Sequence, residues 1–226
     1  MSPRTLHDAA NDALFRPFPL LRPRPRLRAV APPALQHAAA LPVAIEFTIA
    51  AGTTDLAAAE ALVVRCYGWR GYDVEPRDAR QGETTLLARL DGEVVGTLTV
   101  RCGTRLRLQA EAGYAEHVGE LRRQGRRLVE YTRFAIDRER ALPDDLAPQL
   151  MRRALLLGHV ALGATDCVIE VNPRHARYYR REFGFREFGP ERTCERVGAP
   201  ARLLHLDMAV PPACVAHDLR PQPHLH

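Results

Sequence analysis

Hydrophobic and polar positions vary along residues 43–209 with periods that predict a mixture of strands and helices. Stretches rich in β-branched and aromatic residues predict strands at 43–50, 84–90, 93–101, 127–137, 166–171, 185–195 and 201–209. Amphipathic stretches predict helices at about 55–68, 111–124, 145–162 and 173–183. The order is therefore β-α-β-β-(α)-β-α-β-α-β-β, which indicates an α/β (α+β) domain built on one mixed sheet.

Turn and capping residues support several of these boundaries. Asp91-Gly92 is a strong signal for a two-residue hairpin turn between two of the strands. Thr53-Thr54-Asp55 and Asp144-Asp145 offer capping side chains to the helices that follow them. Pro173 suits the first turn of the last helix.

The two ends of the chain differ from the region between them. Residues 1–42 include the run Arg22-Pro23-Arg24-Pro25-Arg26, and the chain from about residue 211 is rich in Pro and His. Such segments bury too little apolar surface to form a core. We therefore expect an N-terminal tail at 1–42, a folded domain at 43–210 and a C-terminal tail at 211–226.

Composition adds few constraints. A hydrophobic share of 46% over 226 residues suits one globular core. No apolar run approaches the roughly 20 residues that span a bilayer, and no signal peptide is recognisable, so we expect a cytoplasmic protein. The five cysteines have no metal-ligand or redox spacing, and we expect reduced thiols at Cys66, Cys102, Cys167, Cys194 and Cys214.

The net charge of +5 comes from a chain in which every basic residue other than histidine is arginine. A basic surface attracts acidic partners, and nucleic acid and an acidic carrier protein are both candidates. The arginines lie in short clusters interleaved with Asp and Glu, and they form no recognised nucleic-acid motif. We therefore expect no nucleic-acid partner.

Two motifs, together with the element order, carry a resemblance to the GNAT acyltransferases. The first is the strand Val168–Val171 followed by Asn172, a helix with Tyr178-Tyr179, and Gly184-Phe185. The second, Glu130-Tyr131-Thr132-Arg133-Phe134-Ala135, resembles a strand of acyl-homoserine lactone synthases and of FeeM-type N-acyl amino acid synthases. Three further segments resemble the FeeM type more closely: 69–72, 169–175 and 199–204. The resemblance covers about residues 44–209 and implies a GNAT fold, with a central mixed, mostly antiparallel sheet flanked by helices.

The turn after strand 127–137 bears on the acyl donor. CoA-dependent GNAT enzymes hold a pyrophosphate on a glycine-rich turn at a helix N-terminus. Residues 138–145 contain no glycine, include Pro143, and place Asp144 and Asp145 where phosphate oxygens would lie. We therefore expect a donor without a pyrophosphate, namely an acyl-phosphopantetheine thioester on acyl carrier protein, which is also what the resemblance implies.

An acidic carrier would be bound by arginines. The candidates are Arg122, Arg123, Arg126, Arg127, Arg152 and Arg153, although each of them is also typical of a solvated helical face. No metal and no redox cofactor is implied. A lipid product would also permit peripheral contact with a membrane.

The expected reaction is attack of an amine on a thioester, which needs a base, donors to the carbonyl oxygen and an acid for the thiolate. The resemblance implies that strands 127–137 and 166–171 diverge around the thioester. Glu130 is the first candidate for the base, with Arg133 as its expected partner if a bulge brings the two to one face. Glu170 is the second candidate, and pairing with an arginine of the neighbouring helix is its alternative role. Tyr179, or Tyr178 beside it, is the candidate acid, and one of the two is expected in the core.

The other candidate residues would bind substrates. Asn172 is expected to hold the thioester arm or to cap the following helix, and His175 is either a base or a surface residue. Arg133 and Arg65 are candidates for gripping an acceptor carboxylate. The remaining candidates for substrate binding are Thr132, Phe134, Trp69 and Tyr72. The acyl chain is expected in a crevice between the sheet and the helices at 111–124 and 145–162.

Taken together, these features predict transfer of a fatty acyl group from acyl carrier protein to the amine of an amino acid. Three alternatives stay open. They are an acyl-homoserine lactone synthase, a CoA-dependent N-acetyltransferase, and a catalytically silent GNAT module that binds an acylated carrier or a lipid.

Overall fold

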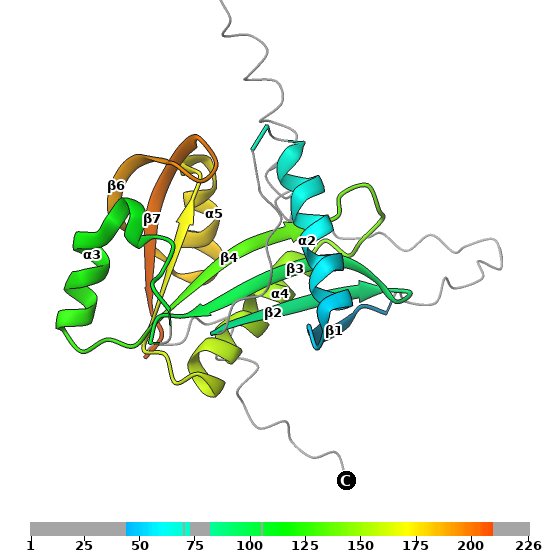
Figure 1. The fold of residues 1–226 in the computed structure, drawn as a ribbon, viewed down its shortest axis with the longest axis horizontal. Coiled ribbons are helices and arrows are strands. Elements are labelled where there is room, and N and C mark those ends of the chain that lie inside the picture. Colours follow the sequence, from blue (N-terminus) through cyan, green and yellow to red (C-terminus); the bar gives the residue numbers. More distant parts are fainter. Residues whose placement is uncertain (1–43, 70, 73–81, 105, 210–226) are drawn as a thin grey trace, which may run out of the picture. The chain divides into compact units, whose positions relative to one another are not determined.

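The computed structural model describes residues 44–69, 71–72, 82–104 and 106–209. Within them the chain forms seven strands and four α-helices in the predicted order (Figure 1). The strands are β1 (Glu46–Ile49), β2 (Glu83–Leu90), β3 (Glu93–Cys102), β4 (Leu128–Ile136), β5 (Asp166–Val171), β6 (Arg186–Cys194) and β7 (Ala199–Asp207). The helices are α2 (Thr53–Gly68), α3 (Glu111–Arg123), α4 (Leu146–Leu156) and α5 (Pro173–Phe183), with the π-helix η1 (Leu157–Ala161) after α4. The two predicted tails lie outside the described residues.

All seven strands form one sheet in the order β1-β2-β3-β4-β5-β7-β6. Every neighbouring pair is antiparallel except β4 and β5, which are parallel. This confirms the predicted mixed, mostly antiparallel sheet. The one parallel pair sits at the centre of the sheet, and the crossover between its strands contains α4.

The hairpin between β2 and β3 forms at the predicted turn. Asp91 and Gly92 both have positive φ, 52° and 81°. Positive φ at both central residues is the requirement of a type I′ turn, whose twist matches that of the flanking strands. The dipeptide Asp-Gly therefore fixes the register of these two strands.

The helices cover the sheet in pairs, two on each face (Figure 1). On one face, α2 packs Leu62 and Val63 against Ala135 of β4. The α3 helix packs on the same face, where its apolar residues contact Leu128 and Val168. We call this face A. Because side chains alternate along a strand, Val129, Tyr131, Cys167 and Ile169 point to the other face, face B.

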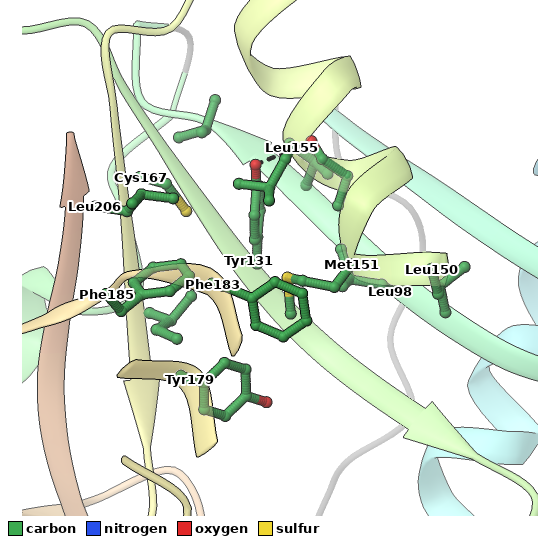
Figure 2. Close-up of a cluster of buried hydrophobic side chains, with 14 of the residues drawn as sticks. Leu98, Tyr131, Leu150, Met151, Leu155, Cys167, Tyr179, Phe183, Phe185 and Leu206 are labelled. Atoms are coloured by element: carbon green, nitrogen blue, oxygen red, sulfur yellow. Dashed lines mark hydrogen bonds between the residues drawn. The ribbon is translucent and has the colours of Figure 1, made fainter. Parts of the chain in front are cut away.

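Face B carries the larger core, in which α4 and α5 pack on the sheet. Figure 2 shows Met151 and Leu155 of α4 lying over β4, and Phe183 of α5 lying beside them. The buried Tyr131 hydroxyl donates to the Ala154 carbonyl oxygen at 2.9 Å, which fixes α4 to β4. Among the described residues, no helix has the length and apolarity needed to cross a membrane.

Helix ends differ in part from the prediction. Asn172 caps α5 by accepting from the Arg174 N–H at 3.1 Å, and Pro173 occupies the first turn as predicted. The predicted caps of the other two helices are only partly formed: the Asp55 carboxylate accepts the Ala51 N–H at 3.0 Å at the start of α2, but neither N-cap residue makes a side-chain cap bond. Gly52 is the N-cap of α2, and Asp145 stands at the N-cap of α4 without a side-chain cap bond. The Asp145 carboxylate instead accepts from the Gln149 side chain at 2.9 Å. The predicted helix 145–162 is α-helical only to Leu156 and then widens into η1.

Candidate functional site

The two central strands begin as a parallel pair and then separate. Their pairing runs from Leu128–Asp166 to Glu130–Val168 and ends there. Beyond this point β4 continues to Ile136 paired with β3, and β5 continues to Val171 paired with β7. The strands therefore diverge towards their carboxyl ends, as predicted, and the backbone edges that face each other are released from mutual pairing.

A β-bulge in β4 lies just beyond the point of divergence. Thr99 of β3 is opposite Thr132, but Thr97 is opposite Ala135, so Arg133 and Phe134 share one partner position. Arg133 takes the left-handed conformation with φ 54°, which is rare for a residue with a side chain. As a result Thr132 and Arg133 both lie on face A, whereas Phe134 packs into the face B core.

Polar side chains form two rows across face A, in the area between α2 and α3. Thr85, Thr99 and Thr132 are direct neighbours across β2, β3 and β4, and the Thr85 and Thr99 hydroxyls are 3.0 Å apart. The next row along the strands is Glu83, Arg101 and Glu130. The Thr132 hydroxyl oxygen is buried and has no hydrogen-bond partner among the described residues. A buried polar surface of this kind is unusual in a sheet core and indicates a binding face.

Glu130 is completely buried at the last paired position before the divergence. Its carboxylate accepts the backbone N–H groups of Gln109 and Ala110 at 2.6 and 2.8 Å, and the Arg101 Nε lies 3.5 Å away. Burial raises the pKa of Glu130 to about 7, against the lowering effect of the two N–H donors and of Arg196 and Arg101. The alternative of an ordinary exposed glutamate is therefore wrong, and the carboxyl group titrates where a general base works best.

Glu170 lies on the same face as Glu130 and is linked to it. Its carboxylate pairs with Arg196, whose other terminal nitrogen donates to the Gln109 side chain. The Gln109 backbone N–H in turn donates to Glu130. Glu170 therefore pairs with an arginine of the turn between β6 and β7, and the prediction of a partner on the neighbouring helix was wrong.

The two arginines expected to grip an acceptor carboxylate are both paired within the protein. Arg133 binds Glu60 of α2, so the expected pair with Glu130 is not formed even though the bulge brings both residues to face A. Arg65 binds Asp137 at 2.8 Å, with its side chain 46% exposed. A ligand carboxylate at either arginine would have to replace a protein carboxylate.

The predicted residues of α5 and its start divide between cap, core and surface. Asn172 caps the helix, and His175 is half-buried beside it. Tyr179 is buried in the face B core against Phe183 and Phe185, and its hydroxyl points away from Phe185 in Figure 2. Tyr178 is half-buried, and burial raises its pKa to about 12. Tyr179 is therefore the tyrosine of the pair that belongs to the core, as one of the two was expected to, and Tyr178 packs against the outside of that core.

The predicted aromatic lining of the acceptor pocket is only partly formed among the described residues. Trp69 follows the end of α2 with 73% of its surface exposed. Tyr72 stacks edge-to-face on Tyr67, with ring centroids 6.3 Å apart. Tyr67 also donates from its hydroxyl to the Phe134 carbonyl oxygen at 3.3 Å, which ties the last turn of α2 to the bulge of β4.

The arginines predicted to bind a carrier fall into two groups. Arg122 and Arg123 of α3 pair with Glu111 and Glu120, and Arg126 lies near Asp166 and Asp207. Arg127 donates to the Gly163 carbonyl oxygen. Arg152 and Arg153 belong to α4, on the opposite face of the sheet, and Arg153 stacks on the Phe47 ring.

The same division overturns the predicted acyl crevice. Because α3 packs on face A and α4 on face B, the two helices cannot line one crevice together with the sheet. Of the predicted thiols, Cys102, Cys167 and Cys194 are free and buried and Cys66 is free and half-buried, while Cys214 lies outside the described residues. The part of the chain that is described contains no grouped His, Cys, Asp or Glu side chains suited to a metal ion.

Three residues of this site were not predicted from the sequence: Arg101, Gln109 and Arg196. Arg101 was detectable, because Thr97, Thr99 and Arg101 form a period-two polar pattern on a strand that is otherwise apolar. Arg196 lies in the turn between β6 and β7, and Gln109 lies before α3. An isolated polar residue in such a place belongs to no periodic pattern that a sequence analysis could detect.

Comparison with known proteins gives one family match. Residues 58–207 match the model of the family described as N-acyl amino acid synthase FeeM. No protein with a curated description matches this chain significantly.

Solved structures share the fold. FeeM, an N-acyl amino acid synthase from uncultured soil microbes, is 22% identical, with a TM-score of 0.67 over 74% of this chain and 91% of that chain. The acyl-homoserine lactone synthase LasI is 17% identical, with a TM-score of 0.56 over 80% of this chain and 100% of its own. An acyl-CoA N-acyltransferase from Pseudomonas aeruginosa is 16% identical, with a TM-score of 0.55 over 72% and 99%. These similarities confirm the fold that the sequence predicted.

Proposed function

The chain belongs to the FeeM family of N-acyl amino acid synthases and is an N-acyltransferase, and from this premise we propose that it transfers a fatty acyl group from acyl carrier protein to the amine of an amino acid. The observation that carries the proposal is the position of Glu130. A carboxyl group with a pKa of about 7 is buried where β4 and β5 stop pairing, on the polar face of the sheet. This is the arrangement that an amine attacking a thioester between the strands requires.

The diverging strands supply the place for the thioester. Once β4 and β5 separate beyond Glu130 and Val168, their facing backbone edges can accept an extended pantetheine arm as an added strand. Backbone N–H groups beside the bulge at Arg133 would stabilise the oxyanion that forms as the amine attacks. The tetrahedral intermediate then collapses by breaking the carbon–sulfur bond, which leaves an amide and a thiolate.

The candidate base and the candidate acid lie on opposite faces of the sheet. Glu130 on face A would take the proton of the attacking ammonium or amine. Tyr179 on face B would give a proton to the departing thiolate. The carbonyl group between the strands would thus be approached by the amine from one side while the sulfur leaves on the other.

The start of α4 favours a carrier-bound donor over coenzyme A. The Leu146 N–H already donates to the Pro143 carbonyl oxygen at 3.1 Å, and Pro148 in the first turn has no N–H to offer. Asp144 and Asp145 add negative charge to this end of the helix. A pyrophosphate would therefore find few donors here, whereas an acyl-phosphopantetheine thioester has no pyrophosphate to place.

The acceptor would lie on face A beside Glu130. The two polar rows provide hydroxyl and charged groups for an amino acid, and Arg133 is our candidate for binding its carboxylate in place of Glu60. Glu170, held by Arg196, would contribute to binding the ammonium group.

The test is product identity. Purified protein is incubated with acylated carriers of several chain lengths and a mixture of the amino acids, and the products are separated by mass spectrometry. We expect open-chain N-acyl amino acids formed from the carrier-bound donor. A matched reaction with S-adenosylmethionine as the acceptor tests for lactones, and one with acetyl-CoA tests for N-acetylation.

Lactone formation, or acetylation that outpaces carrier-dependent acylation, would contradict the proposal. Absence of any product from every donor would favour the alternative of a silent module that only binds an acylated carrier or a lipid.

A further inference from the structure

The exposed side of α5 carries a row of arginines. The helix buries Ala176, Tyr179 and Phe183 against the core. Three arginines of the same helix are exposed, namely Arg174, Arg177 and Arg181. Their spacing of three and four residues places them on one side of the helix, opposite the three buried residues. We call these three residues the α5 arginine row. None of the arginines that were predicted to bind a carrier belongs to it.

Helix stability does not account for the α5 arginine row. The N-terminus is the positive end of a helix dipole, so acidic side chains are favourable there and basic ones are unfavourable. Arg174 nevertheless lies in the first turn, which contains no acidic residue. Within the described part of the chain, Arg177 has no carboxylate partner. Arg181 pairs with Glu182 at 2.6 Å, and its side chain is 53% exposed. An acidic partner would supply the negative charge that the start of this helix lacks.

The α5 arginine row begins at the open end of the diverging strands. The pairing of β4 with β5 ends at Glu130 and Val168, and the strands open towards their carboxyl ends. The α5 helix starts at Pro173, two residues after the last residue of β5. Arg177 is four residues further, about 6 Å along the helix axis. A thioester arm that enters between the strands from this end would hold its carrier beside the first turns of α5.

The helix α3 offers less positive charge, and the chain that follows it leads to the other end of the strands. Arg126 and Arg127 directly precede β4, at the end where β4 and β5 are paired. The α3 helix contains three glutamates and two arginines, whereas α5 contains four arginines and one glutamate. Both arginines of α3, Arg122 and Arg123, pair with glutamates of the same helix. The α5 helix therefore combines the larger positive charge with the position at the open end.

We propose that the α5 arginine row binds the acidic surface of acyl carrier protein while the acyl arm lies between β4 and β5. This rests on the proposed function, because it names the surface that receives the donor of that reaction. Guanidinium groups bind carboxylates through paired N–H donors, and a row of them along one helix suits a row of carboxylates on a partner. Arg180 is not part of the row, because it pairs with Glu187 of β6 at 2.9 Å.

The surroundings of the row favour an acidic protein over a membrane or a nucleic acid. A helix that lies in a membrane interface presents its apolar side to the lipid, but the apolar side of α5 is buried against the core. Single-stranded nucleic acid is held by exposed aromatic residues as well as by charge, and both tyrosines of α5 pack against the core. Arginines without an exposed apolar or aromatic neighbour on their helix suit a charged protein surface.

A binding measurement tests the α5 arginine row without requiring turnover. The phosphopantetheine-bearing form of a bacterial acyl carrier protein is labelled with a fluorophore and titrated with the full-length chain, and binding is followed by fluorescence anisotropy. We expect Arg174→Gln/Arg177→Gln to weaken binding about tenfold at low salt, because two charge pairs would be lost. The difference from the wild type should shrink at about 0.5 M salt, because salt screens exposed charges. Arg174→Lys/Arg177→Lys should keep most of the affinity, because lysine keeps the charge.

The control is Arg107→Gln, which removes one exposed arginine at the other end of the strands. Arg107 follows β3, which is antiparallel to β4, so it lies at the end where β4 and β5 are paired. Its side chain is 74% exposed. We expect Arg177→Gln alone to weaken carrier binding about threefold and Arg107→Gln to leave it unchanged.

Kinetics with two donors separate the carrier from its arm. Arg174→Gln/Arg177→Gln should raise KM for the acyl carrier about tenfold, because the row contacts the carrier protein. The same variant should keep the wild-type KM and kcat for acyl-pantetheine, which has the thioester without the protein. An unchanged kcat with acyl-pantetheine also shows that the variant is folded.

Three results would overturn the inference. The first is a loss of carrier affinity in Arg107→Gln as large as that in Arg177→Gln. The second is a rise in KM for acyl-pantetheine as large as that for the acyl carrier. The third is a double variant that still binds the carrier but has lost binding to phosphatidylglycerol vesicles or to duplex DNA.

The inference and the proposed function fail in different ways. Carrier binding through the row by a protein that makes no N-acyl amino acid would support the inference and contradict the proposed function. N-acyl amino acids that the double variant makes from the acyl carrier with the wild-type KM would support the proposed function and contradict the inference.

Discussion

Glu130 and Glu170 share face A, and Arg196 is the residue that links them. Arg196 pairs with Glu170 and donates to the Gln109 side chain, while the Gln109 backbone donates to Glu130. The positive charge of Arg196 also lowers the pKa of Glu130 against the effect of burial. Arg196 is therefore a positioning residue, which acts on the candidate base without contacting the reacting atoms.

Replacing Arg196 should change the pH dependence of the reaction. In Arg196→Gln the lost positive charge should raise the pKa of Glu130, so the acid limb of kcat/KM should move to higher pH. The loosened Gln109 should lower kcat about tenfold, with a smaller change in the acceptor KM. Arg196→Lys should return the acid limb of kcat/KM to nearly its wild-type pH, because lysine restores the positive charge.

The control is Arg202→Gln, which removes an arginine of β7 that pairs with Glu187 and Glu191. An acid limb that stays in place in Arg196→Gln would show that Arg196 serves only to hold the turn.

Sequence motifs identified the charged residues of this site but not the residues with which they interact. Glu130, Glu170 and Arg133 were identified from motifs. Their partners proved to be Gln109, Arg196 and Glu60. Pairing across a sheet depends on which loop reaches over the strand end, and no local periodicity encodes that.

The strand β4 is the element on which the site depends. Its pairing with β5 ends at Glu130, and its bulge at Arg133 follows directly. The bulge holds Arg133 at φ 54° and brings it to the face of Glu130 and Thr132. A regular strand would have put Arg133 on face B, away from the acceptor side.

The left-handed backbone at Arg133 predicts that glycine there is more stable than alanine, which is the reverse of the order in a helix. Arg133→Ala and Arg133→Gly both lose the pair with Glu60, but only alanine keeps the steric cost of a left-handed residue. We expect Arg133→Ala to be about 1 kcal/mol less stable than Arg133→Gly in urea unfolding, with unchanged m.

The matched pair is Arg177→Ala and Arg177→Gly at an exposed position of α5, where alanine should be the more stable by about 1 kcal/mol. The same order at both positions would mean that the bulge does not hold residue 133 in the left-handed conformation.

Several elements were predictable because a single local rule decides them. Asp91-Gly92 fixed the hairpin turn, and Asn172-Pro173 fixed the start of α5. The bulge in β4 and the π-helix after Leu156 were not predicted. The bulge adds one residue to a strand, and the π-helix adds one residue to a helical turn. In both cases the hydrophobic pattern on either side is compatible with the regular element.

In the molecule as a whole, the sheet separates two sets of functional groups. Face A carries the buried polar rows and Glu130, and face B carries the apolar core with Tyr179. Within the described residues, a substrate between the diverging strands β4 and β5 would contact both sets. The prediction of a crevice between 111–124 and 145–162 was wrong because the sequence gives element order but not the face on which each helix packs.

The account depends on Glu130 acting as the base at this divergence, and its pH profile tests that most directly. Measured with acylated carrier and a productive amino acid, kcat/KM of the wild type should fall about tenfold per pH unit below about pH 7, because the protonated Glu130 cannot accept a proton. Above that pH the ionised carboxylate should give a plateau, until the acceptor or another group titrates. Glu130→Gln should lower kcat/KM by about 10² to 10⁴-fold and should remove the acid limb of the profile. The exposed control Glu187→Gln should keep the wild-type kcat/KM and the acid limb. A Glu130→Gln enzyme that retains the wild-type rate and the same acid limb would contradict the account.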